Sequence, residues 1–579
     1  MECEKTYLGI CFVTPSSSSA APIFGFSEFI PALALLVIVY TLTDIRYRFR
    51  VAVAPLSLLR LTYILIGVIG FGILLTEIWV AERWLVPLSL ISQSQWQGML
   101  GGFFLLLAMG WLYYGFINPP IFCEGNYHKF AQQLYAIVLR GSDAELPVIG
   151  NELARSAGSL VRLSRQIRSA SRSDVSDERE KQPKPDASDY AHDLILLIAN
   201  RKLCRHITAS SPVTAIVFFE EMAINHKYDI PIGTFAANIS AEAILNKDSI
   251  LYHEGEGYIS GLMGYRKDFS KAVYGNFRLV ETLAAAGRSP LDIPFQIVRS
   301  WDASQVEAYS TAVLITLKDY LDSNSWGQHS YALYRALQNI EDSCTDLYKL
   351  NNIADDFYSS DMFRRLDVAV DFVQRAIDLI GEQETLPSTV LRVRDRQRHW
   401  VDFYDRIAEL MFEIIFSASS VKAPPDKCWS IHYNAVWGDF FGLSGREKAW
   451  GIIHHKLRRL LYEEIRQLDD FQNYKSSRIL GFCLNVMGFA IKKKRGYGSE
   501  EYPLQKAVLA WTRKNYLRLR SIQPEVAQSC LIGSISFDEQ DTRLVKTYIK
   551  GLSLEAPKEY LELDPLERHG ESSEGQTGT

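Results

Sequence analysis

Apolar residues gather in three blocks near the start of the chain, and the last block lies in a long gap between charges. From Trp84 through Cys123 there is no Asp, Glu, Lys or Arg, although 22% of all residues are charged. Within this gap Gly98–Ile117 is an apolar run that, as a helix, would be roughly 30 Å long and would match the hydrocarbon core of a bilayer. Aromatic residues near the end of the run are typical of the headgroup boundary of a membrane, and Pro119 and Pro120 then prevent the helix from continuing. The pattern predicts a membrane-spanning helix over 98–117.

Two apolar blocks upstream of this run predict two more spans. One covers 61–80, with Arg60 and Glu77 near its ends, and the first covers 24–42, with Glu28 near its start. The region before the first block lacks the basic start and the small-residue cleavage site of a signal peptide, so we interpret the block as a retained helix. Because these ionisable residues lie near the ends of spans, the pattern favours an anchor over a conduit through the membrane.

Basic residues are unevenly distributed among the segments that connect the predicted spans. The N-terminal tail has Lys5 and the loop between the second and third spans has Arg83. The loop after the first span contains four arginines: Arg46, Arg48, Arg50 and Arg60. Short loops rich in Lys and Arg stay in the cytoplasm. The sequence therefore predicts a multi-pass integral protein of a bacterial inner membrane, with its N-terminus outside and everything after Asn118 in the cytoplasm.

Composition divides the rest of the chain. The segment Ser169–Asp189 is rich in Ser, Pro and charges of both signs and nearly lacks apolar side chains, which predicts a flexible linker or long loop. The far end is acidic and rich in Gly and Ser. The predicted parts are an external tail (1–22), a transmembrane region (23–118), a juxtamembrane helical segment (119–168), a linker (169–189), a helical cytoplasmic domain of one or two subdomains (190–561) and a disordered acidic tail (562–579).

The cytoplasmic domain has the period of amphipathic helices. Apolar positions recur about every 3.6 residues across 447–471, at Trp450, Ile453, Leu457, Leu461, Ile465 and Leu468. Similar patterns predict helices over 131–167, 303–321, 331–358, 362–380 and 394–416. Alternating strand patterns are scarce, with Val213–Phe219 as the one ambiguous stretch. The predicted fold class is mainly α: three transmembrane helices followed by a large α-helical cytoplasmic region.

Charge, cysteine content and motifs exclude several function classes. The net charge of −5 gives no specific nucleic-acid signal. The eight cysteines contain no CxxC pair and no Cys/His metal spacing. Most of them lie in the predicted cytoplasmic region, where buried, reduced thiols are typical, whereas Cys3 and Cys11 would lie outside. A P-loop, a GxGxxG turn after a strand, a GxSxG nucleophile motif and a kinase catalytic loop are all missing. The cofactor stays unknown.

The segment Asn246–Asn276 is the densest group of site-like residues. It contains His253, Glu254 and Glu256 among glycines that allow close backbone approach. A histidine with two carboxylates could bind a divalent metal or act in general acid–base catalysis. The spacing differs from HExxH, so a third metal ligand would have to come from elsewhere. The simpler interpretation is an irregular loop whose polar groups cap the flanking helices.

Three smaller groups have weaker signals. The basic run Lys492, Lys493, Lys494 and Arg495 could contact phosphates of lipid or nucleic acid, or could be a solvated helix end. Asp355, Asp356 and Asp361 resemble the magnesium–diphosphate site of isoprenoid synthases in spacing only, and we interpret them as capping acids at a helix terminus. His454 and His455 are expected on an exposed helix surface.

These patterns lead to one main hypothesis and two alternatives. The main hypothesis is a non-enzymatic membrane-anchored protein whose helical cytoplasmic domain binds a partner or ligand as a scaffold, sensor or regulatory module. Its partners would be the lipid bilayer and another protein or a second copy of the chain. One alternative is a membrane-tethered metal-dependent hydrolase or transferase that uses His253, Glu254 and Glu256. The other is an oligomeric pore or effector gated by the cytoplasmic domain.

Overall fold

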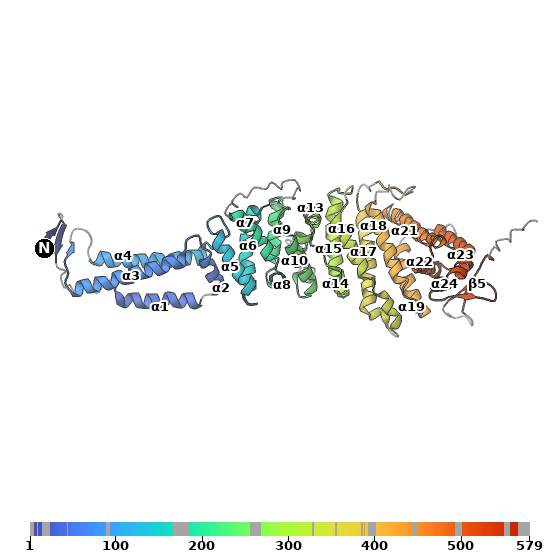
Figure 1. The fold of residues 1–579 in the computed structure, drawn as a ribbon, viewed down its shortest axis with the longest axis horizontal. Helices are drawn as coiled ribbons and strands as arrows, with labels where there is room; N and C mark the ends of the chain where they lie inside the picture. The colour runs from blue at the N-terminus through green and yellow to red at the C-terminus, as the bar shows by residue number, and fades with distance from the viewer. Residues whose placement is uncertain are drawn as a thin grey trace, which may run out of the picture. The chain divides into compact units, whose positions relative to one another are not determined.

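The chain forms two compact units, Met1–Ile239 and Ser240–Thr579, and both consist mainly of helices, as the periodicity predicts. Figure 1 shows the described elements in chain order. The computed structural model describes residues 5–7, 10–13, 24–42, 44–87, 93–165, 185–254, 268–326, 329–353, 356–383, 386, 388–391, 401–442, 448–491, 501–548 and 556–565.

The first unit begins with apolar helices that lie side by side (Figure 1). Its helices are α1 (Phe26–Leu42), α2 (Ile45–Ala52), α3 (Leu58–Ala81), α4 (Gln93–Leu112), the π-helical η1 (Tyr113–Ile117), α5 (Tyr127–Arg140), α6 (Glu145–Leu163), α7 (Ala187–Ile198), α8 (Arg201–Ser210), α9 (Val213–Ile224) and the first part of α10 (Gly233–Leu245). Val213–Phe219, the ambiguous stretch, is therefore helical.

Two helices in the described part of the chain are long and apolar enough to cross a membrane, Leu58–Ala81 and Ser94–Ile117. They correspond to the second and third predicted spans. The first predicted span forms α1, which is apolar but only 17 residues long. The pair α8 and α9 would count as a third span only if its 102° bend were part of one broken helix.

The apolar helices pack through a small cluster of buried side chains. Phe29 of α1 meets Ile69 and Ile73 of α3 and Leu100 of α4, while most of the other side chains of α3 and α4 face outward. The Phe26 backbone N–H donates to Glu77 Oε1 at 2.7 Å, so the start of α1 is held at the far end of α3. Consequently α1 runs antiparallel to α3.

Helix α6 organises the rest of the first unit. It packs against α2, α5, α7, α8 and α9. The predicted helical stretch 131–167 falls into two helices. Helix α5 ends at Arg140, with Gly141 as its C-cap, and the Glu145 carboxylate accepts a hydrogen bond from the Ser142 N–H at 2.8 Å at the start of α6. Such a cap satisfies backbone groups that an uninterrupted helix would not expose.

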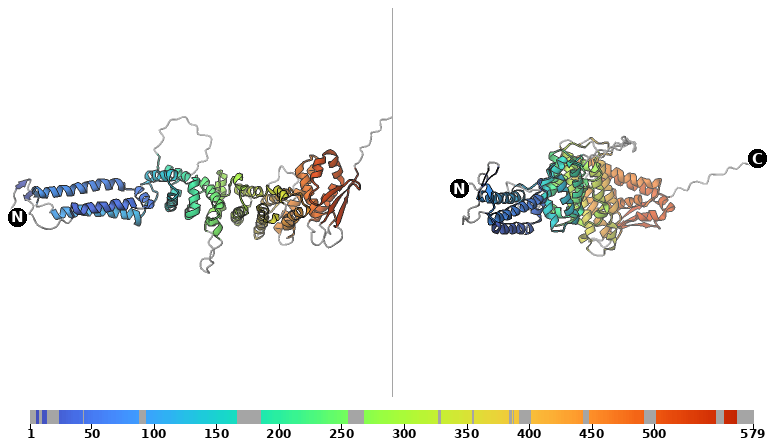
Figure 2. Two further views of the ribbon diagram at one scale, coloured as in Figure 1. Left: turned by 90° about the horizontal axis from the view of Figure 1, so that it is seen from below. Right: turned by 60° about the vertical axis from the view of Figure 1, so that its left-hand side comes forward.

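The second unit is a succession of packed helices, and Figures 1 and 2 show α13 to α22 following one another in chain order. It contains the remainder of α10 and α11 (Ile250–His253), α12 (Asp268–Tyr274), α13 (Phe277–Ala285), α14 (Phe295–Val298), α15 (Ala303–Asp322), α16 (Tyr331–Asp342), η2 (Leu347–Asn352), η3 (Phe357–Ser359), α17 (Asp361–Gly381), α18 (Phe403–Ala418), α19 (Pro425–Trp429), the π-helical η5 (Ser430–Trp437), α20 (Gly438–Phe441), α21 (Lys448–Arg466), η6 (Gln467–Asp469), α22 (Tyr474–Met487), α23 (Tyr502–Ile522) and α24 (Pro524–Ser529).

Helices of this succession pack against others that lie near them in the chain. Helix α16 packs against α13, α15 and α18, while α18 packs against α17, α21 and α22. The helices predicted over 303–321, 362–380 and 447–471 are confirmed as α15, α17 and α21. The one predicted over 331–358 ends at Asp342, where Ser343 and Thr345 hydroxyls donate to backbone carbonyls and compete with helix continuation.

Two small antiparallel sheets accompany the helices of this mainly α fold. One pairs β1 (Lys5–Tyr7), β2 (Ile10–Val13) and β3 (Val86–Pro87), and the other pairs β4 (Ile535–Asp538), β5 (Arg543–Thr547) and β6 (Lys558–Glu562). The second sheet includes buried Leu544 and Leu561, which are partners in its register. These strands are too short for their alternation to be distinguished from chance.

Two helical glycines provide a matched test of how tightly α22 is packed. A Cβ at Gly481 would lie 2.3 Å from the Cys530 carbonyl oxygen, whereas a Cβ at Gly451 in α21 would meet nothing within 4 Å. We expect Gly481→Ala to lower the free energy of unfolding by about 2 to 3 kcal/mol because backbone must move. Gly451→Ala should leave it unchanged or raise it by up to about 1 kcal/mol. Denaturant titration checks both, and equal effects would contradict the packing.

Candidate functional site

The predicted His253/Glu254 site has its carboxylate engaged in capping a helix. Glu254 is buried and accepts hydrogen bonds from the Phe269 N–H at 2.6 Å and the Ser270 N–H at 3.1 Å, and the Ser270 hydroxyl donates to it as well. These donors belong to the first turn of α12, where an anion is favoured. Glu256 lies outside the described residues.

The surroundings of Glu254 give no metal-ligand geometry within the described residues. The cavity beside Glu254 has a volume of about 250 Å³, and Tyr252, Ser270 and Glu307 also line it. No group of three or more His, Cys, Asp or Glu that could hold a metal ion occurs anywhere in the described part of the chain. The basic run Lys492, Lys493, Lys494 and Arg495 also lies outside that part.

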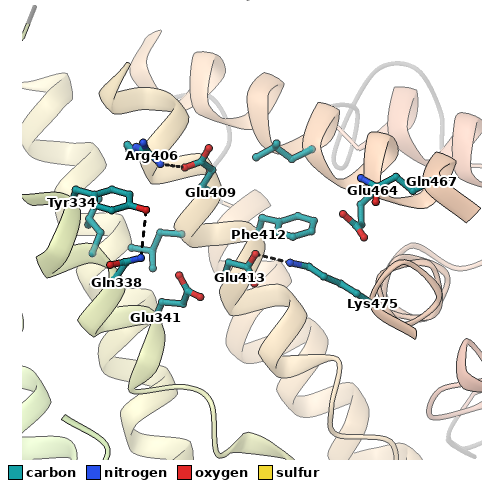
Figure 3. A pocket seen from close by; sticks show the side chains of 13 residues that line it. Tyr334, Gln338, Glu341, Arg406, Glu409, Phe412, Glu413, Glu464, Gln467 and Lys475 are labelled. Atoms are coloured by element: carbon teal, nitrogen blue, oxygen red, sulfur yellow. Dashed lines mark hydrogen bonds and ion pairs between the residues drawn. The ribbon is translucent and has the colours of Figure 1, made fainter. Parts of the chain in front are cut away.

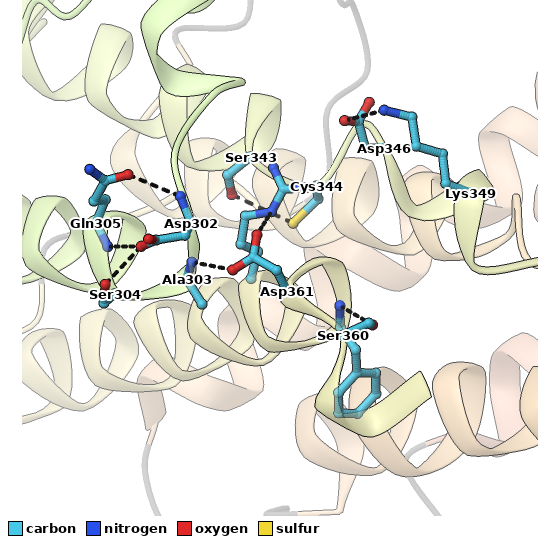
Figure 4. Close-up of polar contacts among 12 residues, drawn as sticks. Asp302, Ala303, Ser304, Gln305, Ser343, Cys344, Asp346, Lys349, Ser360 and Asp361 are labelled. Carbon is cyan, nitrogen blue, oxygen red and sulfur yellow. Dashed lines mark hydrogen bonds and ion pairs between the residues drawn. The ribbon is translucent and has the colours of Figure 1, made fainter. Parts of the chain in front are cut away.

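Asp361, from the aspartate-rich segment, joins two helices of the second unit. Its Oδ1 accepts a hydrogen bond from the Ala303 N–H at 2.8 Å, at the start of α15, and its Oδ2 lies 3.3 Å from Arg365 Nε (Figure 4). At the same helix start the Asp302 side chain accepts from the Gln305 N–H and forms a capping box. Asp361 therefore has the capping role that the sequence suggested, while Asp355 lies outside the described residues.

Cys428, His432 and Asn485 form a buried cluster of reactive side-chain types. His432 Nδ1 lies 3.5 Å from Cys428 Sγ and 3.2 Å from Asn485 Nδ2, and His432 Nε2 lies 2.9 Å from the Ala418 carbonyl oxygen. Burial raises the pKa of the Cys428 thiol to about 12 and lowers the pKa of His432 to about 4. Both groups are neutral at pH 7 and closed to solvent, so the cluster acts as core structure.

Two polar residues of α21 are buried, and one of them, His454, was expected on an exposed helix surface. His454 is buried, stacks on Phe441 and lies 2.5 Å from the Phe440 carbonyl oxygen through Nε2. Lys456 is fully buried, with Nζ 2.7 Å from Asp405 Oδ1. The prediction that His454 is exposed was wrong because helices pack on two sides of α21, whereas the sequence pattern revealed only its broad apolar stripe.

The best candidate for a ligand site is a cavity of about 350 Å³ in the second unit (Figure 3), which we call the glutamate pocket. Its walls come from one face each of α16, α18 and α21, with η6 and α22 closing one side. It is lined by Tyr334, Leu337, Gln338, Glu341, Arg406, Glu409, Leu410, Phe412, Glu413, Leu460, Glu464, Gln467 and Lys475.

The two cations of the glutamate pocket are each held by a glutamate and an aromatic ring. Arg406 Nη1 lies 2.7 Å from Glu409 Oε2, and its guanidinium carbon lies 4.5 Å from the centre of the Tyr334 ring. Lys475 Nζ lies 2.7 Å from Glu413 Oε1 and 5.0 Å from the centre of the Phe412 ring. Carboxylate together with an aromatic face is the combination that favours amine and guanidinium groups.

Carboxylates outnumber cations in the pocket, and Glu341 is left over. Glu464 accepts a hydrogen bond from the Ser476 hydroxyl at 2.7 Å, but the side chain of Glu341 has no hydrogen bond or ion pair within the described chain. Figure 3 shows the Glu341 side chain between α16 and α18 on the side of Glu413, whose own carboxylate is directed at Lys475. Burial, and then the charge of Glu413, raises the pKa of Glu341 to about 7. The charge of Lys475 opposes this shift only in part, so the ionised form of Glu341 is destabilised.

The sequence contains a signal for this pocket that helical periodicity alone does not reveal. Tyr334, Leu337, Gln338 and Glu341 follow the spacing i, i+3, i+4, i+7, and so do Arg406, Glu409, Leu410 and Glu413. Each set therefore lies on one face of its helix. Leucines within a polar stripe indicate a face that is partly buried, but only the fold shows that the two stripes meet.

A larger cavity exists in the first unit, but it offers little chemistry. The groove of about 680 Å³ between α5 and α7 is lined mainly by apolar and aromatic groups, including Tyr135, Tyr190 and Leu197, with His128 and Asp193 as its ionisable groups. Ligand sites combine apolar walls with converging polar groups. We therefore regard the glutamate pocket as the stronger candidate despite its smaller volume.

The capping role of Glu254 leads to a direct test of the metal-site alternative. Glu254→Gln should lower the thermal stability of the full chain by about 1 to 3 kcal/mol, because buried donors of α12 lose a charged acceptor. The metal content of the purified protein, measured by mass spectrometry, should be the same for this variant and the wild type. The metal-site alternative would gain support if a stoichiometric divalent ion were present and departed with the substitution, while Glu382→Gln, an exposed control, retained it.

Comparison with known proteins leaves the function to be argued from this geometry. No protein-family model matches the chain, and no match is found among curated proteins or solved structures. The residues that the structure brings together are those of the glutamate pocket, whereas the predicted residue Glu254 caps a helix.

Proposed function

We propose that this chain is a membrane-anchored binding protein whose helical region takes a cationic ligand, an amine or guanidinium group, in the glutamate pocket. The observation that carries the proposal is the uncompensated Glu341 in a cavity whose two resident cations already sit between glutamates and aromatic rings. Binding replaces the unfavourable proximity of Glu341 and Glu413 with a charge-assisted hydrogen bond.

A three-span anchor is supported by the position of α1. The Glu77 contact fixes the start of α1 beside one end of α3, and α2, which follows α1, packs with Leu58 at the opposite end of α3. Helix α1 therefore extends along the whole apolar layer, although it is only about 26 Å long. The pair α8 and α9 is a poorer third span, since α8 includes Arg201, Lys202 and Arg205 and packs against α6.

An odd number of spans places the two ends of the chain on opposite sides of the membrane. We expect a cysteine introduced by Ser18→Cys, in a Cys3→Ser/Cys11→Ser background, to react with a membrane-impermeant maleimide in intact cells. A cysteine introduced by Ser323→Cys, at the end of α15, should react only after the membrane is permeabilised. Equal labelling of both positions in intact cells, or of neither, would contradict the three-span topology.

The glutamate pocket should bind a polyamine in a pH-dependent manner. We expect spermidine to bind the full chain in detergent, measured by calorimetry at low ionic strength, and diacetylated spermidine to bind less tightly. Affinity should rise between about pH 6 and about pH 8, because a cation selects the ionised form of Glu341, whose pKa lies at about 7. Binding should also release protons over this range.

Substitution of Glu341 distinguishes this pocket from unspecific attraction to acidic surface. Glu341→Gln should weaken spermidine binding about tenfold near pH 8 and remove most of the pH dependence, since the charge-assisted contact is lost. Glu382→Gln changes an exposed carboxylate outside the pocket and should bind like the wild type. If the two variants weaken binding equally, the pocket is not the site.

A further inference from the structure

The boundary between the apolar helices and the helices that follow them contains a buried ionic joint. Arg50 of α2 donates through Nε to Glu152 Oε2 at 3.0 Å and through Nη2 to Glu152 Oε1 at 2.5 Å. Its third nitrogen, Nη1, donates to the Gly115 carbonyl oxygen at 2.9 Å. Arg50 therefore connects α2, the end of the α4 span and α6 through one side chain, and we call these three residues the arginine joint.

Burial makes the arginine joint a strong constraint. Arg50 is 9% exposed and Glu152 is 5% exposed. A buried ion pair tolerates little displacement, because separating it leaves a charge without solvent or partner. The bidentate geometry also fixes direction, since a guanidinium and a carboxylate must stay coplanar to keep both hydrogen bonds. Movement of one helix therefore has to be followed by the others.

The span end that Arg50 contacts has an unusual backbone. Residues Tyr113–Ile117 form a π-helical turn, in which Asn118 N–H donates to the Tyr113 carbonyl five residues back. Such turns are rare, hold an extra residue and leave backbone groups for other partners. Here Gly115 supplies a carbonyl to Arg50, and the ring of Phe116 lies 4.3 Å from that of Tyr47, which is on α2.

On the other side of the joint, α6 is well placed to pass on a displacement. The Ser156 hydroxyl of α6 accepts a hydrogen bond from the Phe122 N–H at 3.2 Å, and the Thr214 hydroxyl of α9 donates to the Gly150 carbonyl at 2.8 Å. Gly158 allows close approach of Glu221, also on α9. Glu152 thus lies on a helix that is fastened to the span side and to α9.

We propose that the arginine joint is a conformational coupling device: a displacement of the π-helical end of α4 displaces helix α6, and a displacement of α6 displaces the end of α4. Arg50 acts as the connecting residue, and η1, with its extra residue, is the element that changes. The inference does not depend on the ligand of the glutamate pocket. It requires that a disturbance of η1 reach α6 only while Glu152 is charged.

Hydrogen exchange of the full chain in lipid nanodiscs tests this coupling. Phe116→Ala removes an exposed ring from the contact with Tyr47 and should speed amide exchange in α6 around 149–156 by about tenfold. Glu152→Gln should itself speed exchange in both η1 and α6. In the Glu152→Gln background, Phe116→Ala should add no further change in α6. Independent, additive effects of the two substitutions would overturn the proposal.

Two further variants separate coupling from general damage. Arg48→Gln, at an exposed position of α2, should leave exchange in η1 and α6 as in the wild type. The exchanged pair Arg50→Glu/Glu152→Arg is made together with Arg46→Gln, because Arg46 Nε lies 3.8 Å from Glu152 Oε1 and would repel an arginine at position 152. This variant should restore slow exchange in α6 but not in η1, because a glutamate at position 50 cannot donate to the Gly115 carbonyl. Fast exchange across the entire unit in this variant would contradict the separate roles of the two contacts.

Discussion

The bidentate ion pair between Arg50 and Glu152 is the constraint on which the first unit depends. Two charges taken out of water are tolerable only if their hydrogen-bonding capacity is used, and here the guanidinium satisfies a carboxylate and the Gly115 carbonyl together. The surrounding contacts are consistent with this arrangement. Asn126 donates to the Val53 and Ile121 carbonyls, and Lys129 donates to the Pro55 carbonyl, so the chain entering and leaving the apolar helices is fastened at the same level.

Periodicity predicted most of the helical fold, because burying an apolar stripe depends on local spacing. The helices α15, α17 and α21 follow this rule, whereas the two longer apolar helices were predicted from the length of their apolar runs. Residue roles were harder to predict. In the sequence Arg50 was one of four arginines in a predicted loop. Its partner Glu152 lies 102 residues away, in a helix with an ordinary amphipathic pattern. Sequence composition indicates on which side a basic loop lies, but not which arginine is buried.

The same limit applies to the candidate site. Glu254 stood out because glycines surround it, and the structure uses its carboxylate as the cap of α12. The sequence did not indicate a special role for Glu341, because its helix has an ordinary amphipathic pattern and the residues that face it come from α18, α21 and α22. A pocket assembled from several helices is a property of their packing. Local patterns can show that a polar stripe is partly buried, as with Glu409 and Glu413, but they do not show what faces it.

The buried and half-buried charges of this protein differ in whether their partners are already present, and that difference separates scaffold from candidate site. Arg50 with Glu152, and Lys456 with Asp405, pair within the fold, so another ion would have to displace an existing partner. The polar cluster around His432 avoids the problem by staying neutral. Glu341 has neither solution. It is half-buried, the charge that affects it most is that of another carboxylate, Glu413, and its pKa of about 7 lies where a small change in surroundings decides whether it is charged. An arriving cation gains most where the fold has left a carboxylate in this condition, which is why we place the ligand at Glu341 and not at the stronger ion pairs.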